Sequence, residues 1–78
     1  MEQKIKQDDK IHIGENVREI RLQRGYKQTE VVRRMQLIGE TMTRESYVKI
    51  ERGIQHISAS QLRAIKEVLK TTYDELLK

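Results

Sequence analysis

The sequence predicts an all-α domain of five short helices. Apolar residues recur at helical spacing between four glycines, no segment alternates convincingly as a strand would, and the 78-residue chain contains no proline. The length fits one small domain, and aromatic residues make up only 4% of it. We therefore expect a thin core built from Ile, Leu, Val and Met side chains.

The first helix is expected over residues 12–24, ended by Gly25 in the position where a glycine often terminates a helix. Its inward face carries apolar residues spaced i, i+4 and i+7: Ile13, Val17 and Ile20. The preceding residues are mostly polar. They predict an N-terminal tail over residues 1–11 and a domain over residues 12–78.

The second helix is expected over residues 28–38, with Gly39 at its exit. Its inward side chains are expected to be Val31, Val32, Met35 and Ile38. A third helix is expected over residues 44–51 and is stopped by Gly53. The hydroxyl of Thr43 can cap it by accepting a hydrogen bond from the backbone of residue 45 or 46. Its inward side chains are expected to be Tyr47 and Ile50.

Capping-box patterns predict where the last two helices begin. Ser58 and Gln61 have the spacing of such a box and open a fourth helix, whose buried residues are expected to be Leu62, Ile65 and Leu69. Thr72 and Glu75 repeat the pattern and open a short fifth helix that carries Leu76 and Leu77.

Composition excludes several classes of function. The chain has no cysteine, hence no disulfide and no thiolate nucleophile, and no apolar run exceeds two residues, so the expected compartment is the cytoplasm. His12 and His56 have no partner at ligand spacing, and Met35 and Met42 suit packing. We expect no metal, no cofactor and no small-molecule ligand. No nucleophile–base pair or phosphate loop is evident, which predicts a protein that is not an enzyme.

The charge favours a polyanionic partner. Lys and Arg total 16 against 12 acidic residues, for a net charge of +4. Residues 13–34 carry a basic surplus of three. Four arginines of this region are expected on solvated helix faces: Arg18, Arg21, Arg24 and Arg34.

Two stretches around the second and third helices carry a family pattern: residues 25–32 (GYKQTEVV) and residues 43–53 (TRESYVKIERG). Gln28 and the IERG of residues 50–53 are its most specific parts. The flanks also fit, with IGENVREIR at residues 13–21 and YDELL at residues 73–77. Over roughly residues 12–77 the chain resembles the helix-turn-helix of Cro- and phage-repressor-type (XRE-like) DNA-binding domains.

The chain departs from this family pattern in four places. Lys27 replaces the usual capping Ser or Thr, Val32 replaces an alanine, and several extra residues separate the second and third helices. The longer turn removes the tight glycine corner, which makes the small side chain less necessary. Finally, Lys66 and Lys70 replace an alanine and a glycine. At a left-handed C-cap, Lys70 costs about 1 kcal/mol relative to glycine.

If Tyr47 and Ile50 point inward, the opposite face of the third helix is available to read bases in the major groove. That face is expected to carry Arg44, Glu45, Val48, Lys49 and Arg52, of which the first four are the candidate base readers. Arg44 can donate to guanine O6 and N7, Glu45 can accept from cytosine, and Val48 can touch a thymine methyl. The structural alternatives are a plain surface arginine and valine, and a helical ion pair between Glu45 and Lys49.

A second set of residues is expected to hold the DNA backbone. Gln28 occupies the position where the family grips phosphate or an outer base. The remaining members of this set are Lys27, Thr43, Arg33 and Arg52. Contacts of this kind fix the register of the protein on DNA and make affinity depend on salt.

The resemblance implies a sequence-specific regulator of transcription that binds double-stranded DNA, most simply a repressor that acts as a homodimer on an inverted repeat. Candidate dimer contacts are Leu76, Leu77, Tyr73 and Leu37. Two other functions remain open: a helical protein-interaction or antitoxin-like module on the same fold, and a nonspecific nucleoid-type binder. The sequence identifies neither the operator nor the regulated genes.

Overall fold

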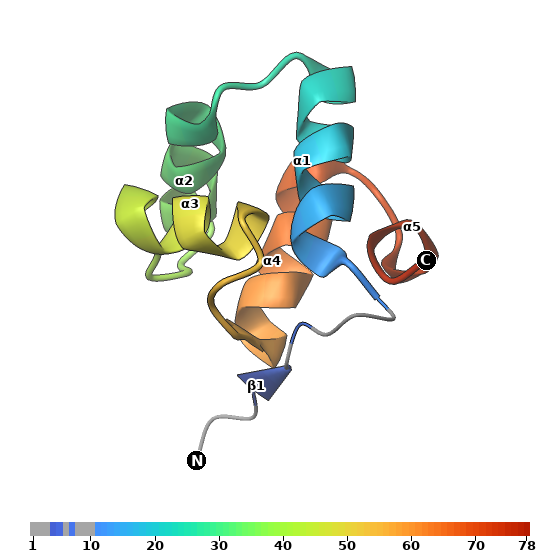
Figure 1. Ribbon diagram of the computed structural model, residues 1–78. Helices are drawn as coiled ribbons and strands as arrows, with labels where there is room; N and C mark the ends of the chain where they lie inside the picture. Colours follow the sequence, from blue (N-terminus) through green and yellow to red (C-terminus); the bar gives the residue numbers. More distant parts are fainter. Residues whose placement is uncertain (1–3, 6, 8–10) are drawn as a thin grey trace.

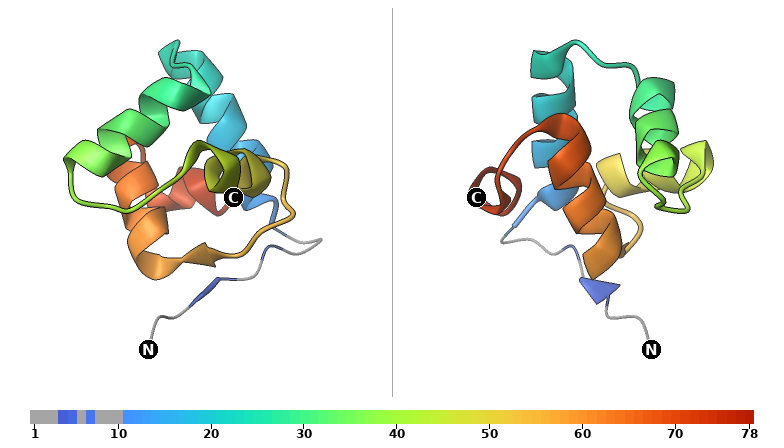
Figure 2. Two further views of the ribbon diagram at one scale, coloured as in Figure 1. Left: turned by 90° about the vertical axis from the view of Figure 1, so that its left-hand side faces the viewer. Right: turned by 180° about the vertical axis from the view of Figure 1, so that it is seen from behind.

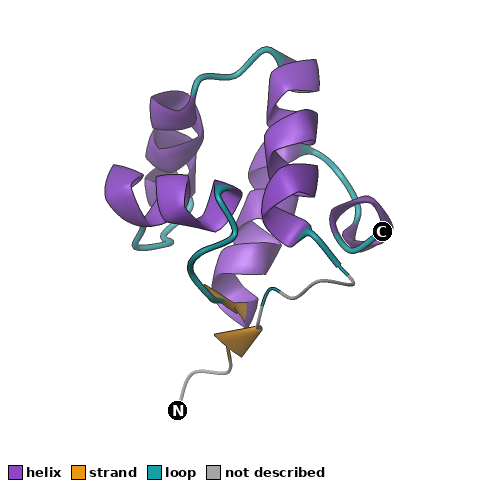
Figure 3. Ribbon diagram, in the orientation of Figure 1, coloured by secondary structure: helices purple, strands orange, loops and turns teal. Residues whose placement is uncertain are grey.

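The computed structural model describes residues 4, 5, 7 and 11–78. Within them it contains five helices, which confirms the predicted all-α class (Figures 1 and 3). Their bounds are α1 (Ile13–Arg24), α2 (Gln28–Leu37), α3 (Arg44–Glu51), α4 (Ala59–Leu69) and α5 (Tyr73–Leu76). None of these helices is long and apolar enough to cross a membrane.

α1 packs against α3, α4 and α5, and α2 packs against α3 and α4. α1 and α2 lie on one side of α4, α3 crosses beside α1 and α2, and α5 lies against α1 at the other end of the domain (Figures 1 and 2). This arrangement leaves one side of α3 at the surface while its other side faces the core. The position of α3 is therefore decided by two helices that come before it in the chain.

The helix ends follow the predicted capping residues. Gly25 ends α1 in the left-handed conformation, with φ +75°. The hydroxyl of Thr43 accepts from the backbone N–H of Ser46, and Ser58 and Gln61 form the reciprocal capping box of α4. The hydroxyl of Thr72 accepts from the backbone N–H of Glu75 at the start of α5. Side-chain caps therefore open α3, α4 and α5.

Lys70 ends α4 in the left-handed region, with φ +53°, as the departure from the family glycine predicts. The guanidinium of Arg24 supports this end by donating to the carbonyl oxygens of Leu69 and Lys70 at 3.0 and 3.2 Å. Arg24 is exposed, as expected, and its side chain also completes the last turn of a neighbouring helix.

The core is aliphatic, as composition predicts, with Tyr47 as its one fully buried aromatic residue among those described. One inward assignment was wrong. Ile38 is 52% exposed because α2 ends at Leu37 and the chain turns away before residue 38 can face the core. Met42, at the end of the connection to α3, is buried instead.

Two short strands were not expected. β1 (Lys4–Ile5) pairs antiparallel with β2 (Ile57–Ser58), and Ile5 is opposite Ile57. Ile5 is the one apolar side chain after Met1 in residues 1–10 of the sequence, and it packs against the core cluster. Part of this segment is therefore attached to the domain, and the predictions for residues 1–3, 6 and 8–10 lie outside the described residues.

Candidate nucleic-acid interface

α3 is reached by a lengthened connection that the structure holds in a defined shape. Gly39 adopts a positive φ of +92°, which glycine permits without strain. The amide nitrogen Nε2 of Gln36 donates to the carbonyl oxygen of Met42 at 2.7 Å. With Met42 buried and Thr43 capping the helix, the start of α3 is fixed by side chains from both ends of the turn.

The inner face of α3, defined by Tyr47, Ile50 and Glu51, is buried. Tyr47 and Ile50 are there as predicted. The N-terminal end of α1 approaches the far end of this helix so closely that a β-carbon added to Gly14 would collide with the carbonyl oxygens of Ile50 and Glu51. Glycine is thus required at position 14 by the contact between α1 and α3.

A buried ion pair joins α1 to the inner face of α3. Arg21 donates through Nε to Oε2 of Glu51 at 2.7 Å and through Nη2 to Oε1 at 3.1 Å. Its third nitrogen, Nη1, donates to the carbonyl oxygen of Tyr26 at 2.9 Å. The bond to Glu51 raises the pKa of Arg21 further above its usual value. Two N–H···O bonds therefore hold the two side chains together.

The expectation that Arg21 is solvated was wrong, and the sequence holds a signal that could have corrected it. Arg21 follows Val17 by four residues, so it lies on the buried stripe of α1. Glu51 follows Tyr47 by the same interval on α3. Opposite charges at inward positions of two packed helices predict a buried pair, since a lone charge there would be strongly destabilising.

Gln28, the first residue of α2, connects to this pair. Its Nε2 donates to Oε1 of Glu51 at 3.0 Å, and its side chain is half-buried. A primary amide has two N–H groups, so one remains for an outside acceptor. The first backbone N–H groups of α2 also have no partner within the helix. Gln28 therefore links the core of the domain to the exposed N-terminus of α2.

The hydroxyl of Tyr47 lies beside the same carboxylate. It is buried, and no described residue gives it a hydrogen-bond partner of good geometry. Burial raises the pKa of this hydroxyl far above its usual 10, and the neighbouring Glu51 carboxylate adds to the shift. Tyr47 is therefore neutral throughout the physiological range.

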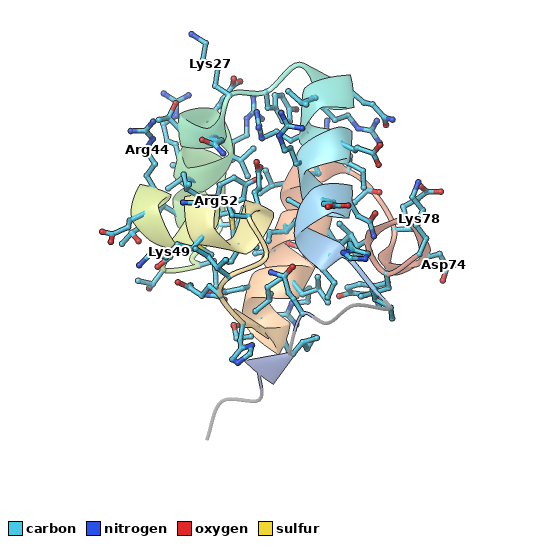
Figure 4. The ribbon with its side chains drawn as sticks, viewed as in Figure 1. Lys27, Arg44, Lys49, Arg52, Asp74 and Lys78 are labelled. Atoms are coloured by element: carbon cyan, nitrogen blue, oxygen red, sulfur yellow. The ribbon has the colours of Figure 1, made fainter. Side chains whose placement is uncertain are left out.

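The outer face of α3 consists of Arg44, Glu45, Val48, Lys49 and Arg52. These side chains line one shallow, open depression of about 490 Å³. Val48 is half-buried and the other four are exposed. Three positive charges oppose one negative charge. The four predicted base-reading residues thus gather in one place together with Arg52, and Figure 4 shows Arg44, Lys49 and Arg52 along this helix.

Glu45 and Lys49 form an ion pair across one helical turn, with Nζ and Oε1 3.5 Å apart. This is the contact that the structural alternative predicts. Both side chains are largely exposed, and pairs of this kind contribute only about 0.3–0.5 kcal/mol. A phosphate or base edge can replace such a contact with little loss.

The predicted phosphate-contacting residues are more dispersed. Lys27 is exposed at the N-terminus of α2, on the same side of the molecule as Arg44 in Figure 4. Thr43 is exposed and used as a cap, and Arg33 is exposed on α2 outside the depression. Glu30 adds a local contact by accepting from the backbone N–H of Lys27 at 3.4 Å, which is one half of a capping box, while the Lys27 side chain makes no capping hydrogen bond.

The other arginines have different surroundings. Arg18 is exposed, as expected. Arg34 is half-buried: its guanidinium lies 4.7 Å from the centre of the Tyr26 ring and 3.6 Å from the Glu30 carboxylate, so it is not simply solvated. His12 and His56 are both exposed, and no group of three potential metal ligands occurs in the described part of the chain.

Comparison with known proteins agrees with this geometry. A family model described as helix-turn-helix matches residues 17–76, which is most of the chain and includes α2, the connection and α3. No curated protein and no solved structure matches the chain at a significant level. A buried inner face, a charged outer face and a family match over the same helices lead to one conclusion: the chain belongs to the Cro/C1-type, XRE-like family of DNA-binding helix-turn-helix domains.

Proposed function

We propose that this protein is a sequence-specific transcriptional regulator that reads the major groove with α3. The observation that carries the proposal is the outer face of α3, where four exposed charged side chains surround Val48. A helix fits the major groove of B-DNA, and side chains from its first turns reach base edges. Arg44 leads this face and is the expected reader of guanine.

In this proposal, three neighbours of Arg44 also contact bases. Glu45 accepts from a cytosine amino group, Lys49 donates to a second guanine, and Val48 packs on a thymine methyl. The ion pair between Glu45 and Lys49 opens when the two side chains find bases, since an exposed pair is weak. The same acidic residue repels misplaced phosphates and so sharpens selectivity.

A second set of groups is proposed to grip the sugar–phosphate backbone: Gln28, Lys27, Thr43, Arg33 and Arg52. The N-terminus of α2 favours an anion through its free backbone N–H groups and its helix dipole. Gln28 contributes its remaining N–H group at this end while Glu51 holds the rest of its side chain in place. These contacts make binding sensitive to salt but not to sequence.

We further propose that the protein acts as a homodimer on an inverted repeat, because one helix-turn-helix reads only a few base pairs. One of the expected dimer contacts is excluded: Leu76 is fully buried in the core. Leu37 is 76% exposed, and Tyr73 and Leu77 are partly exposed, so these three remain. Repression is the simplest outcome, since a bound dimer that overlaps a promoter needs no further contact.

Selection of bound sequences from a random duplex pool tests the proposal. A recovered motif with two-fold symmetry supports both specificity and the dimer, and light scattering of the protein with that duplex gives the stoichiometry directly. A monomer in both states would overturn the dimer. Affinity for the selected duplex less than about 10³-fold above the nonspecific level would favour a nucleoid-type binder.

The alternative of a protein-interaction or antitoxin-like module predicts a different result. Such a module would retain a protein partner in a pull-down at moderate salt and would select no sequence from the random pool. The outer face of α3 is mostly charged, which suits a nucleic-acid groove better than an apolar protein surface.

A further inference from the structure

The side chain of Gln7 joins three separate parts of the backbone. Its Oε1 accepts from the backbone N–H of Gly14 at 2.9 Å. Its Nε2 donates to the carbonyl oxygens of Ile50 at 2.9 Å and Gln55 at 3.0 Å. The orientation of the amide is fixed by its partners, because one is a donor and two are acceptors. Every polar group of this side chain except one acceptor lone pair is thereby used.

One of these partners is a backbone N–H in the first turn of α1, and the other two are carbonyl groups at the end of α3 and in the loop that follows it. Gly14 is in the first turn of α1, where the N-cap residue His12 makes no side-chain hydrogen bond to the helix. Ile50 is in the last turn of α3, where its carbonyl oxygen also accepts from the backbone N–H of Gly53 at 3.0 Å, so Gln7 is a second donor to it. The amide of Gln7 therefore contacts the start of α1 and the end of α3 at once. Its oxygen faces the N-terminus of α1 and its nitrogen faces the C-terminus of α3, as the dipoles of the two helices favour.

The position of Gln7 in the chain is also fixed. Just before it, β1 pairs with β2, which follows α3 by a few residues. Just after it, the chain enters α1, and at Gly14 α1 meets the last turn of α3 without room for a side chain. The N-terminal segment is thus attached to both sides of the loop that leaves α3.

We propose that Gln7 is a positioning residue for DNA recognition: it sets the orientation of α3 by fixing its C-terminal end. The inference rests on the proposed function, since it concerns the same helix. The turn bonded by Gln36 and Met42 fixes the opposite end of α3. At the C-terminal end, Gln7 adds backbone contacts to the side-chain bonds that Arg21 makes with Glu51. Gln7 itself does not contact DNA in this proposal.

Two substitutions in the full chain separate this role from simple stabilisation. Gln7→Ala removes all three bonds. Gln7→Glu keeps an acceptor for Gly14 but places negative oxygen against the carbonyls of Ile50 and Gln55. If Gln7 only capped α1, the Glu variant would behave as the parent does. Gln23→Ala, at an exposed position of α1, is the matched control.

Each protein is titrated with the duplex selected by the parent and with a scrambled duplex of equal length, at a temperature where circular dichroism shows it folded. We expect both Gln7 variants to reduce the ratio of the two affinities by at least about fivefold, the value of one weak base contact. Amide resonances of residues 44–53 should shift in both variants, and the control should match the parent.

Two results would overturn the inference: a parent-like ratio in Gln7→Ala despite a lower melting temperature, or full rescue by Gln7→Glu. If the parent protein does not discriminate between the two duplexes, the result contradicts the proposed function and not the role of Gln7. The amide spectra then decide the role of Gln7 alone, because unchanged resonances over α3 would show that it does not orient the helix.

Discussion

The two faces of α3 belong to one eight-residue helix but have opposite surroundings. The inner face joins Tyr47, Ile50 and Glu51 to the core, and its carboxylate is bonded to two other helices. The outer face carries exposed charges, and the ion pair between Glu45 and Lys49 is weak. The inner face thus contributes to folding and the outer face to the proposed recognition of DNA, so stability and DNA binding should respond to different substitutions.

The largest effect is expected from the inner face. Arg21→Met leaves the buried Glu51 carboxylate without its cation, which costs about 3–5 kcal/mol of folding free energy. Urea denaturation followed by circular dichroism measures this change. The double variant Arg21→Met, Glu51→Leu should recover most of the loss, because no unpaired charge remains. Equal stability of the parent and the single variant would mean that the pair does not connect the helices as described.

The next largest effect is expected from Arg44→Ala, which tests the outer face. It should weaken binding to the selected duplex by about 1–3 kcal/mol and relax the preference at one base pair, while the folding free energy changes by less than about 0.5 kcal/mol. Fluorescence titration against duplexes with single-base changes measures both effects.

Arg52→Ala is the matched comparison for Arg44→Ala, since it removes the same charge from the other end of the outer face. It should weaken binding to all duplexes alike and reduce the slope of log K against log salt by about one unit. If Arg44→Ala behaved in this way too, with no base preference lost, α3 would not read bases through that residue.

The pH dependence of stability provides a smaller test of the inner face. The pKa of Tyr47 is raised in the folded state. The stability that its neutral hydroxyl contributes is therefore fully present below the unfolded pKa of 10 and is lost as the pH rises above that value. The loss approaches about 1.4 kcal/mol per pH unit there. Between pH 8 and about 11, the free energies of unfolding of the parent and of Tyr47→Phe should diverge with this slope. Parallel curves would show that Tyr47 titrates normally.

The smallest effect is expected from the ion pair of the outer face. A double-mutant cycle with Glu45→Ala and Lys49→Ala should give a coupling of about 0.3–0.5 kcal/mol in thermal unfolding, and it should disappear at high salt. A coupling above about 1 kcal/mol would mean that this face also contributes to folding.

The sequence predicted what depends on local rules. Capping at Thr43 and Ser58, the glycine end of α1 and the inward placement of Tyr47 all follow from spacing within one helix. The grouping of Arg44, Glu45, Val48 and Lys49 on one face follows for the same reason. Their contacts with DNA stay predictions.

Long-range contacts were missed because they join residues far apart in sequence. The bonds of Gln7 to Ile50 and of Arg24 to Leu69 cross 43 and 45 residues, and no local pattern marks either one. The exposure of Ile38 was missed for a different reason: helical spacing continues past the point where the backbone leaves the helix. Only Arg21 and Glu51 left a usable signal, through their positions on two buried stripes.

The network of Arg21, Glu51 and Gln28 has a consequence for the shape of the operator. It couples three helices through one carboxylate, so a change in the tilt of α3 would break several bonds together. A recognition helix that resists distortion requires the DNA duplex to change shape instead. In the proposed dimer, two rigid domains on one inverted repeat would favour spacers with easily bent steps such as TA and CA, even at base pairs that no side chain touches.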